Sequence, residues 1–433
     1  MKTLASTRNS AKAAVKNVFY GWWIVYAGSV VMAVSAGINF YGFSAFFLPL
    51  SEEFGWKRSV LSGVFSLSRL EGGLFGPLEG FLIDKFGPRT MMLFGVPLMG
   101  IGFIVFSQVN SLLSLYIIYI FLITLGSSLG TFSPVGAAVA NWFVKKRSRA
   151  IGITMAGVAV GGAVCMPILG WLITDYGWRF TAVVSGIAIL VLGVPVAFLM
   201  RQKPEQYGLL PDGASVSDTN KDAGSRESLG AQAEVALTAW QSLRTRTFWF
   251  LGISLTLRSL VTTGLTIHFV AMMVDRGFSL TIASSLLGSV ALLSIVGRLG
   301  VAWLGDFLDK RYLLAVALGL MAVSLLGLAL TEDRWLAAAI LVVYAVGYGG
   351  AIVLPMAIQA EYFGRRSYAT IRGLLGSVQT PGMLVGPVFA GLVYDITGSY
   401  VTAFLGFALA GLLAALLLLG VRKPASPSPA VTP

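Results

Sequence analysis

The sequence predicts an all-α membrane protein with about twelve transmembrane helices in two related six-helix halves. The 433-residue chain is 56% hydrophobic and only 12% charged, with a mean hydropathy of +0.81. A soluble domain of ordinary composition carries about 25% charged residues. The apolar runs repeatedly reach about 20 residues, which is the length that crosses a hydrocarbon layer about 30 Å thick. Because these runs are continuous rather than alternating, helices are expected rather than a closed barrel.

The apolar runs divide the chain into successive expected spans, and each takes its bounds from the charged or turn-forming residues that flank it. They are 20–48, 58–83, 91–109, 112–142, 150–174, 178–200, 247–271, 281–304, 312–331, 335–360, 370–394 and 400–421. The first run is too long for the core of a signal peptide, so an uncleaved first helix is expected. Residues 201–246 are polar and are expected to form a flexible linker between halves 1–200 and 247–433.

The distribution of Lys and Arg residues predicts how the chain is oriented. Most of the 31 lie in the N-terminal tail, in the linker and in alternate loops, including Lys85, Arg89 and Arg149. Only a few lie in the loops on the other side. Since positive residues collect on the cytoplasmic side, both termini and the linker are expected in the cytoplasm, at the cell membrane. The net charge of +12 therefore reflects topology, and no nucleic acid is expected as a partner.

The two halves repeat at an offset of about 220 residues. Residues 80–89 (GFLIDKFGPR), after the second span, match 302–311 (AWLGDFLDKR), after the eighth. Pro167 and Asp175 likewise match Pro387 and Asp395. Repeats of six spans that run in the same sense are typical of one transporter architecture.

With these paired loops the sequence resembles the Major Facilitator Superfamily over nearly its whole length. Residues 80–89 resemble the signature loop between helices 2 and 3, and Arg149-Ala150-x-Gly152 resembles the loop between helices 4 and 5. Within the superfamily it resembles the bacterial monocarboxylate transporter and oxalate/formate antiporter group. The supporting segments are YGWW at 20–23, KPE at 203–205, GLLPDG at 208–213 and Arg298 in span 8.

The signature loop also predicts a conformational latch. Asp84 ends a helix beside cytoplasmic cations, and Asp306 occupies the matching place in the second half. Ion pairs of this kind can hold one state of a two-state protein and break in the other. The expected members of the latch are Asp84, Lys85, Arg89, Arg149 and Asp306. Ordinary surface charge, worth under about 1 kcal/mol, is the alternative.

Charges inside spans identify the candidate binding residues, because a charge at mid-bilayer costs roughly 3 kcal/mol on insertion scales. Arg298 in span 8 can grip a carboxylate with two parallel hydrogen bonds, and the resemblance implies a substrate-binding arginine in helix 8. The family often has an acidic or amide residue four positions earlier, where this chain has Ser294. Arg258 in span 7 is expected either to contact the anion or to pair with Glu71.

Two residues are candidates for proton coupling. Glu71 is the one deeply placed carboxylate, and burial would raise its pKa; a static partner for Arg69 or Arg258 is the alternative. His268 is the sole histidine and lies late in span 7. Its titration range suits coupling, although a lone histidine on an apolar helix is more often a hydrogen-bonded core residue.

Uncharged polar residues complete the expected lining, since the resemblance implies that helices 1, 4, 7 and 10 face the cavity. Tyr344 and Tyr348 are four residues apart and share a helix face. Tyr41 is roughly where animal monocarboxylate carriers have a helix-1 lysine, and Gln379 roughly where the oxalate/formate exchanger has a helix-11 lysine. A site lacking both lysines favours monoanions, unless Arg258 supplies a second charge.

These observations favour a secondary transporter of a small organic anion, a monocarboxylate, working by alternating access with a proton. A drug or amphiphile efflux carrier and an anion exchanger are the alternatives. No nucleophile–base pair, metal cluster or phosphate loop is present in the sequence, so neither an enzyme nor a cofactor is expected. One chain contains both halves of a transport unit, so a functional monomer is expected.

Overall fold

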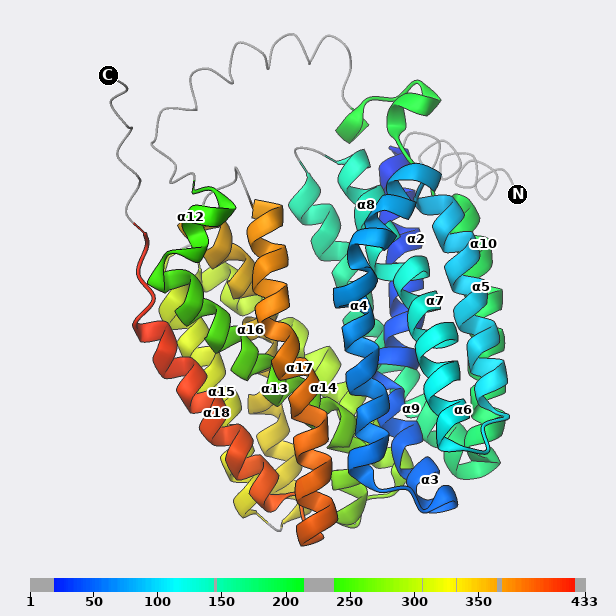
Figure 1. Ribbon diagram of the computed structural model, residues 1–433, viewed down its shortest axis with the longest axis vertical. Helices are drawn as coiled ribbons and strands as arrows, with labels where there is room; N and C mark the ends of the chain where they lie inside the picture. Colours follow the sequence, from blue (N-terminus) through cyan, green and yellow to red (C-terminus); the bar gives the residue numbers. More distant parts are fainter. Residues whose placement is uncertain are drawn as a thin grey trace, which may run out of the picture.

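The computed structural model describes residues 19–143, 146–213, 237–305, 307–331, 333–363 and 368–424. Within these ranges the chain forms helices and no β-strand, which confirms the all-α class (Figure 1). Asp306 lies outside the described residues. Glu71 and Asp84 lie on a described helix, but their side chains are outside the description.

The first half begins with α2 (Tyr20–Ser35), which runs through a π-helical turn, η1 (Ala36–Tyr41), into α3 (Phe43–Phe54). Next come α4 (Arg58–Phe86) and α5 (Pro88–Phe106). The fourth span consists of α6 (Leu112–Ile117), η2 (Ile118–Thr124), α7 (Leu125–Ser127), η3 (Ser128–Phe132) and α8 (Ser133–Trp142). The half ends with α9 (Arg147–Ala188), η4 (Ile189–Gly193) and α10 (Val194–Leu199).

Short 3-10 turns, η5 (Pro204–Tyr207) and η6 (Pro211–Gly213), follow the first half, and α12 (Ala239–Leu243) precedes the second. The second half contains α13 (Arg246–Asp275), α14 (Leu280–Leu304), α15 (Lys310–Leu330), α16 (Arg334–Phe363), α17 (Tyr368–Thr397) and α18 (Val401–Leu419). The expected linker of 201–246 is therefore partly helical where it is described.

Each expected span has a helical counterpart. By length and composition, nine helical stretches among the described residues are long and apolar enough to cross a membrane. One of these, Arg149–Leu199, contains Gly177 at φ 82°, where the chain turns back, so it supplies two expected spans. The more polar α4 and α17 are 29 and 30 residues long, which is also sufficient to span a bilayer.

Glycine pairs bring helices together in the same way in both halves. A Cβ on Gly157 or Gly161 of α9 would lie 2.4 or 2.0 Å from carbonyl oxygens of α2. A Cβ on Gly382 or Gly386 of α17 would lie 2.1 Å from carbonyl oxygens of α13. Such spacing lets helix backbones approach closely. Gly157 and Gly161 therefore allow close packing of span 5 on span 1, and the equivalent contact made by span 11 supports the internal repeat.

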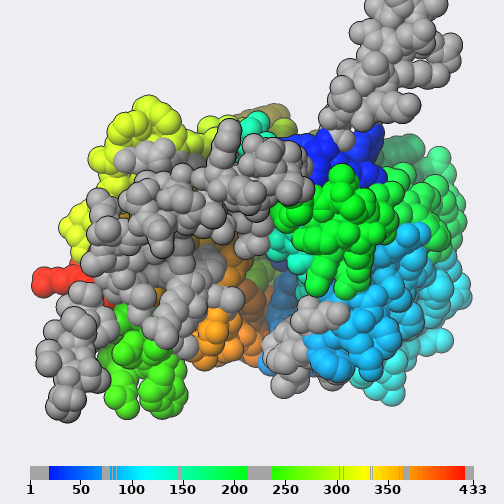
Figure 2. Space-filling view, turned by 90° about the horizontal axis from the view of Figure 1, so that it is seen from above, coloured from blue at the N-terminus to red at the C-terminus, as the bar shows by residue number. Residues whose placement is uncertain are grey.

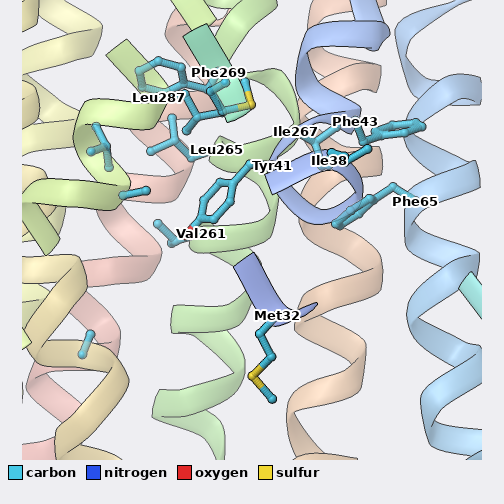
Figure 3. Close-up of a cluster of buried hydrophobic side chains, with 14 of the residues drawn as sticks. Met32, Ile38, Tyr41, Phe43, Phe65, Val261, Leu265, Ile267, Phe269 and Leu287 are labelled. Carbon is cyan, nitrogen blue, oxygen red and sulfur yellow. The ribbon is translucent and has the colours of Figure 1, made fainter. Parts of the chain in front are cut away.

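The two halves lie side by side, with α17 along α4 and α14 along α9 (Figure 1). Figure 2 shows the end that carries α12 and the start of α2, with the blue-to-cyan first half beside the yellow-to-red second half. We call this the linker end and the other the distal end. Residues of η1 pack against α13 in the core, where Tyr41 lies near Val261 and Leu265 (Figure 3).

Candidate functional site: an arginine–tyrosine cluster between the halves

Arg258 lies near the middle of α13 and is held by polar groups of α16 and α17. Its Nη1 donates a hydrogen bond to the carbonyl oxygen of Ala351 at 2.9 Å, and its Nη2 donates to Oε1 of Gln379 at 3.2 Å. Tyr344 and Tyr348 are its electrostatic neighbours, and their rings stack with centroids 6.1 Å apart. Three helices of the second half therefore meet around one guanidinium group.

Tyr41 and Arg298 join the same cluster from two other elements. Tyr41 is only 2% exposed, and its hydroxyl has Tyr348, Arg298 and Tyr344 as electrostatic neighbours. Figure 3 shows its ring reaching from η1 toward Val261 of α13. The six residues predicted to contact substrate thus come together across the two halves. We call them the arginine–tyrosine cluster: Tyr41, Arg258, Arg298, Tyr344, Tyr348 and Gln379.

Small residues explain why these side chains meet. A Cβ on Gly349 of α16 would lie 2.0 Å from the carbonyl oxygen of Ser294 and 2.9 Å from the nitrogen of Arg298. A Cβ on Gly162 of α9 would lie 2.9 Å from the ring of Tyr41. The absence of these two side chains lets α16 approach α14 and leaves room for the tyrosine ring.

The cluster is positively charged and rich in hydrogen-bond donors. Among the described residues neither arginine forms an ion pair, and the Nε atoms of both are buried without a hydrogen-bond partner. Ser294, at the position of the expected carboxylate, is fully buried and donates to the carbonyl oxygen of Ala291 in its own helix. A carboxylate between the arginines would supply the counter-charge and accept the free N–H groups.

His268 lies elsewhere, about ten residues or roughly 15 Å of helix beyond Arg258. It is fully buried, with Nδ1 2.8 Å from the hydroxyl of Tyr400 and Nε2 2.9 Å from both Ser62 Oγ and the carbonyl oxygen of Pro387. These contacts join α13 to α4, to α17 and to Tyr400, the residue that precedes α18. Glu71, the other coupling candidate, has no described side chain.

The distal end holds a polar contact between the halves that the sequence analysis did not identify. Arg58, at the start of α4, pairs with Asp275 through hydrogen bonds of 2.7 and 3.1 Å and donates to the hydroxyl of Tyr400 at 2.8 Å. The two oxygens of Asp395 accept from the backbone nitrogens of Arg58 and Ser59, each at 3.0 Å. All the acceptors lie in the second half, so these contacts hold the halves together at the distal end. We call Arg58, Asp275, Asp395 and Tyr400 the distal latch.

The expected latch at the linker end differs from the distal latch in the contacts that its described cations make. Lys85, Arg89 and Arg149 are exposed, and the described contacts of the first two are with aromatic rings. Lys85 lies 5.3 Å from the ring centroid of Phe86, and Arg89 lies 5.6 Å from that of Phe198. Since Asp84 and Asp306 contribute no described side chains, the latch stays a prediction.

A cavity of about 550 Å³ opens beside the cluster, between α4, η1, η2, η3 and α17. It is lined by residues of both halves from the middle of the spans toward the linker end. Arg69, which the sequence analysis treated only as a neighbour of Glu71, is among the lining residues. The available signal was its depth in an apolar span, as for Arg258 and Arg298.

Several known transporters are similar in sequence to this chain. Monocarboxylate transporter 13 of Rattus norvegicus is 28% identical over 404 residues, covering 90% of this chain and 87% of that protein. Monocarboxylate transporter 12 of Homo sapiens is 24% identical over 420 residues, covering 93% and 81%. The oxalate:formate antiporter of Oxalobacter formigenes is 26% identical over 209 residues, covering 48% of each.

Solved structures agree on the fold. The crystal structure of a bacterial homologue of the human lysosomal transporter Spinster, inward-facing and unoccupied, matches with a TM-score of 0.71 at 17% identity, covering 93% of this chain and 95% of that chain. The family profile described as Major Facilitator Superfamily matches residues 29–381 and 307–433. The chain therefore belongs to the Major Facilitator Superfamily, whose members are transporters rather than enzymes, and is related to monocarboxylate transporters and to the oxalate:formate antiporter.

Proposed function

We propose that the chain is a secondary active transporter of a small organic anion, a monocarboxylate, which it moves across the cell membrane by alternating access. The observation that carries the proposal is the arginine–tyrosine cluster. It gathers two guanidinium groups at mid-depth, between the halves, without a described carboxylate to neutralise them. A buried positive charge without a counter-ion is costly, and a substrate carboxylate removes that cost when it binds.

In this proposal each member has a defined role. Arg298 binds the carboxylate, and Arg258 adds a second charge while Gln379 and the Ala351 carbonyl orient it. The hydroxyls of Tyr41, Tyr344 and Tyr348 donate to remaining substrate oxygens. Because the cluster includes Tyr41 from the first half, a bound anion contacts both halves. A substrate that contacts both halves can bind one arrangement of the halves more tightly than the other, which is how a ligand shifts a two-state equilibrium.

We further propose that transport is coupled to protons, that the termini and linker are cytoplasmic, and that the monomer is the working unit in the lipid bilayer. Glu71 and His268 are the coupling candidates, and the three hydrogen-bond contacts of His268 favour a packing role for it. With a cytoplasmic linker end, the closed distal latch corresponds to a state that is open to the cytoplasm. The alternative, a drug or amphiphile efflux carrier, is disfavoured by the two deep arginines.

The experiment measures uptake of labelled lactate, pyruvate, formate and oxalate into proteoliposomes, with and without an inward proton gradient. Wild type is compared with Arg298→Ala and with Arg246→Ala, which removes an exposed arginine from the start of α13. Gradient-stimulated uptake of one acid, lost in Arg298→Ala and kept in Arg246→Ala, is expected. Uptake of no acid, or uptake that Arg298→Ala leaves intact, contradicts the proposal. Uptake that requires unlabelled acid inside the proteoliposomes and does not depend on the proton gradient would identify an anion exchanger.

A further inference from the structure

The cavity of about 550 Å³ and the arginine–tyrosine cluster are neighbours that share two elements. In η1, Asn39 and Phe40 line the cavity, whereas the next residue, Tyr41, joins the cluster. In α17, Thr380 lines the cavity, whereas Gln379 binds Arg258. The cavity and the cluster therefore adjoin in the region between the halves, so a ligand held at the cluster lies close enough to place its far end in the cavity.

Among the described residues that line the cavity, Arg69 is the one cation, and its guanidinium group lies over aromatic rings. Its guanidinium carbon lies 4.2 Å from the ring centroid of Phe65 and 4.9 Å from that of Phe40. Close by, the hydroxyl of Tyr119 donates to Oδ1 of Asn39 at 3.0 Å. This bond orients the amide so that its NH₂ group remains available as a donor.

Serine and threonine are the commonest residues in the described cavity lining, and the protons of most of their hydroxyl groups are already used in hydrogen bonds. Ser128 donates to the carboxylate of Glu79 at 2.6 Å. Four more donate to carbonyl oxygens of their own helices: Ser68 at 2.6 Å, Thr124 at 2.9 Å, Thr380 at 3.2 Å and Ser377 at 3.3 Å. The hydroxyls of Ser35 and Ser127 lie 3.1 Å apart and are hydrogen-bonded to each other. A hydroxyl has one proton and two lone pairs, so these side chains offer the cavity acceptors rather than donors.

We propose that this cavity, here called the hydroxyl pocket, binds the hydroxyl-bearing tail of the transported carboxylate. The substrate class is then a polyhydroxylated monocarboxylate. Each hydroxyl of such a tail can donate to the pocket's serine and threonine oxygens and accept from Arg69 or Asn39. The inference rests on the proposed function, because the cluster must hold the carboxylate.

Other tails of similar size match the pocket less well. An alkyl tail would strip water from the wall oxygens and replace none of their hydrogen bonds. A second carboxylate could meet Arg69, but it has no proton to donate to the serine and threonine oxygens of the wall. An ammonium tail would face the charge of Arg69. A volume of about 550 Å³ also falls within the range of about 300–1,000 Å³ typical of organic ligand sites. The pocket therefore has room for a tail of several carbons.

The test measures equilibrium binding of labelled gluconate to the purified full chain in nanodiscs, with competition by hexanoate and adipate. All three acids have six carbons, and they differ in hydroxyl and carboxylate content. Gluconate is expected to bind at least roughly tenfold more tightly than either competitor, since several hydrogen bonds of the hydroxyl tail contribute. Ser377→Ala and Thr380→Val are each expected to weaken gluconate roughly fivefold and to leave hexanoate unchanged.

Ser289→Ala is the matched control. Ser289 also donates to a carbonyl of its own helix, at 2.9 Å from Ser285, but it is exposed and does not line the cavity. If hexanoate or adipate binds as tightly as gluconate, the inference of a polyhydroxylated substrate is wrong, whereas the proposal of carboxylate transport is unaffected. The same conclusion follows if the Ser377→Ala variant behaves like Ser289→Ala. Failure to bind any of the three acids, in a chain that also takes up none of the short acids, overturns the proposed function as well.

Discussion

Replacing Arg58 with Ala should open the distal end of the protein. Among the described residues, the partners of the Arg58 side chain lie in the second half. They are Asp275, Tyr400 and the ring of Tyr394, whose centroid is 3.6 Å from the guanidinium carbon. These contacts exist only while the distal end is closed. Their loss therefore destabilises that state relative to the state open at the distal end, and not the fold as a whole.

The size of the effect follows from burial. Removing one member of a fully buried ion pair costs about 3–5 kcal/mol. The Arg58 side chain is 9% exposed and that of Asp275 is 31% exposed, so water partly screens the pair and about 2 kcal/mol is the expected loss. A shift of about 2 kcal/mol changes the ratio of the two states roughly 30-fold.

Electron–electron distance measurements between spin labels would detect this shift. The labels replace Tyr176 in the first half and Leu336 in the second, both exposed near the distal end, in a Cys165→Ser background. Arg58→Ala should increase the fraction of molecules with the longer distance. Lys57→Ala, which removes the exposed neighbouring cation, should not. Identical distance distributions in the two variants would refute the assignment of a distal latch.

Two further substitutions test the site and its surroundings. Gly162→Val places a side chain 2.9 Å from the ring of Tyr41 and should destabilise the purified chain by about 1–3 kcal/mol through overpacking. Gly152→Val, where a Cβ meets nothing within 4 Å, is the control in the same thermal melts, and equal melting of the two variants would contradict the packing argument. His268→Gln should lower thermal stability, because contacts to Tyr400 and Pro387 are lost. It should nevertheless keep gradient-stimulated uptake, whereas loss of gradient dependence in a folded variant would restore His268 as the coupling residue.

The sequence predicted the cluster well because a polar group in an apolar helix is conspicuous. Arg258 and Arg298 interrupt continuous hydrophobic runs, and Tyr344 and Tyr348 share a face through their spacing of four. Helical periodicity then determined which side chains point the same way. The residues were identified without knowledge of their neighbours, which is why Ala351 and Gly349 of α16 were not identified.

Three features lay beyond this reasoning. In the π-helical turn η1, Tyr41 joins the cluster whereas Asn39 lines the cavity. A prediction that uses the regular helical period of 3.6 residues does not include this wider turn. Arg58 and Asp275 lie at the ends of spans, where charged residues are ordinary, so only tertiary structure reveals that they pair. Asp395 matched Asp175 in the repeat, but the repeat alone did not reveal that Asp395 caps the start of α4.

The distal latch also constrains what must happen at the linker end. Alternating access requires two states separated by only a few kcal/mol, since otherwise the minor state is too rare to carry flux. The Arg58 contacts favour one state by about 2 kcal/mol on the screening argument above. Contacts formed when the linker end closes must offset that amount. The signature loops, with exposed Lys85, Arg89 and Arg149 in the state described, supply cations for such contacts. Neutralising them should then favour the distally closed state, opposite in sign to Arg58→Ala, and combining the two changes should return the distance distribution toward that of the wild type.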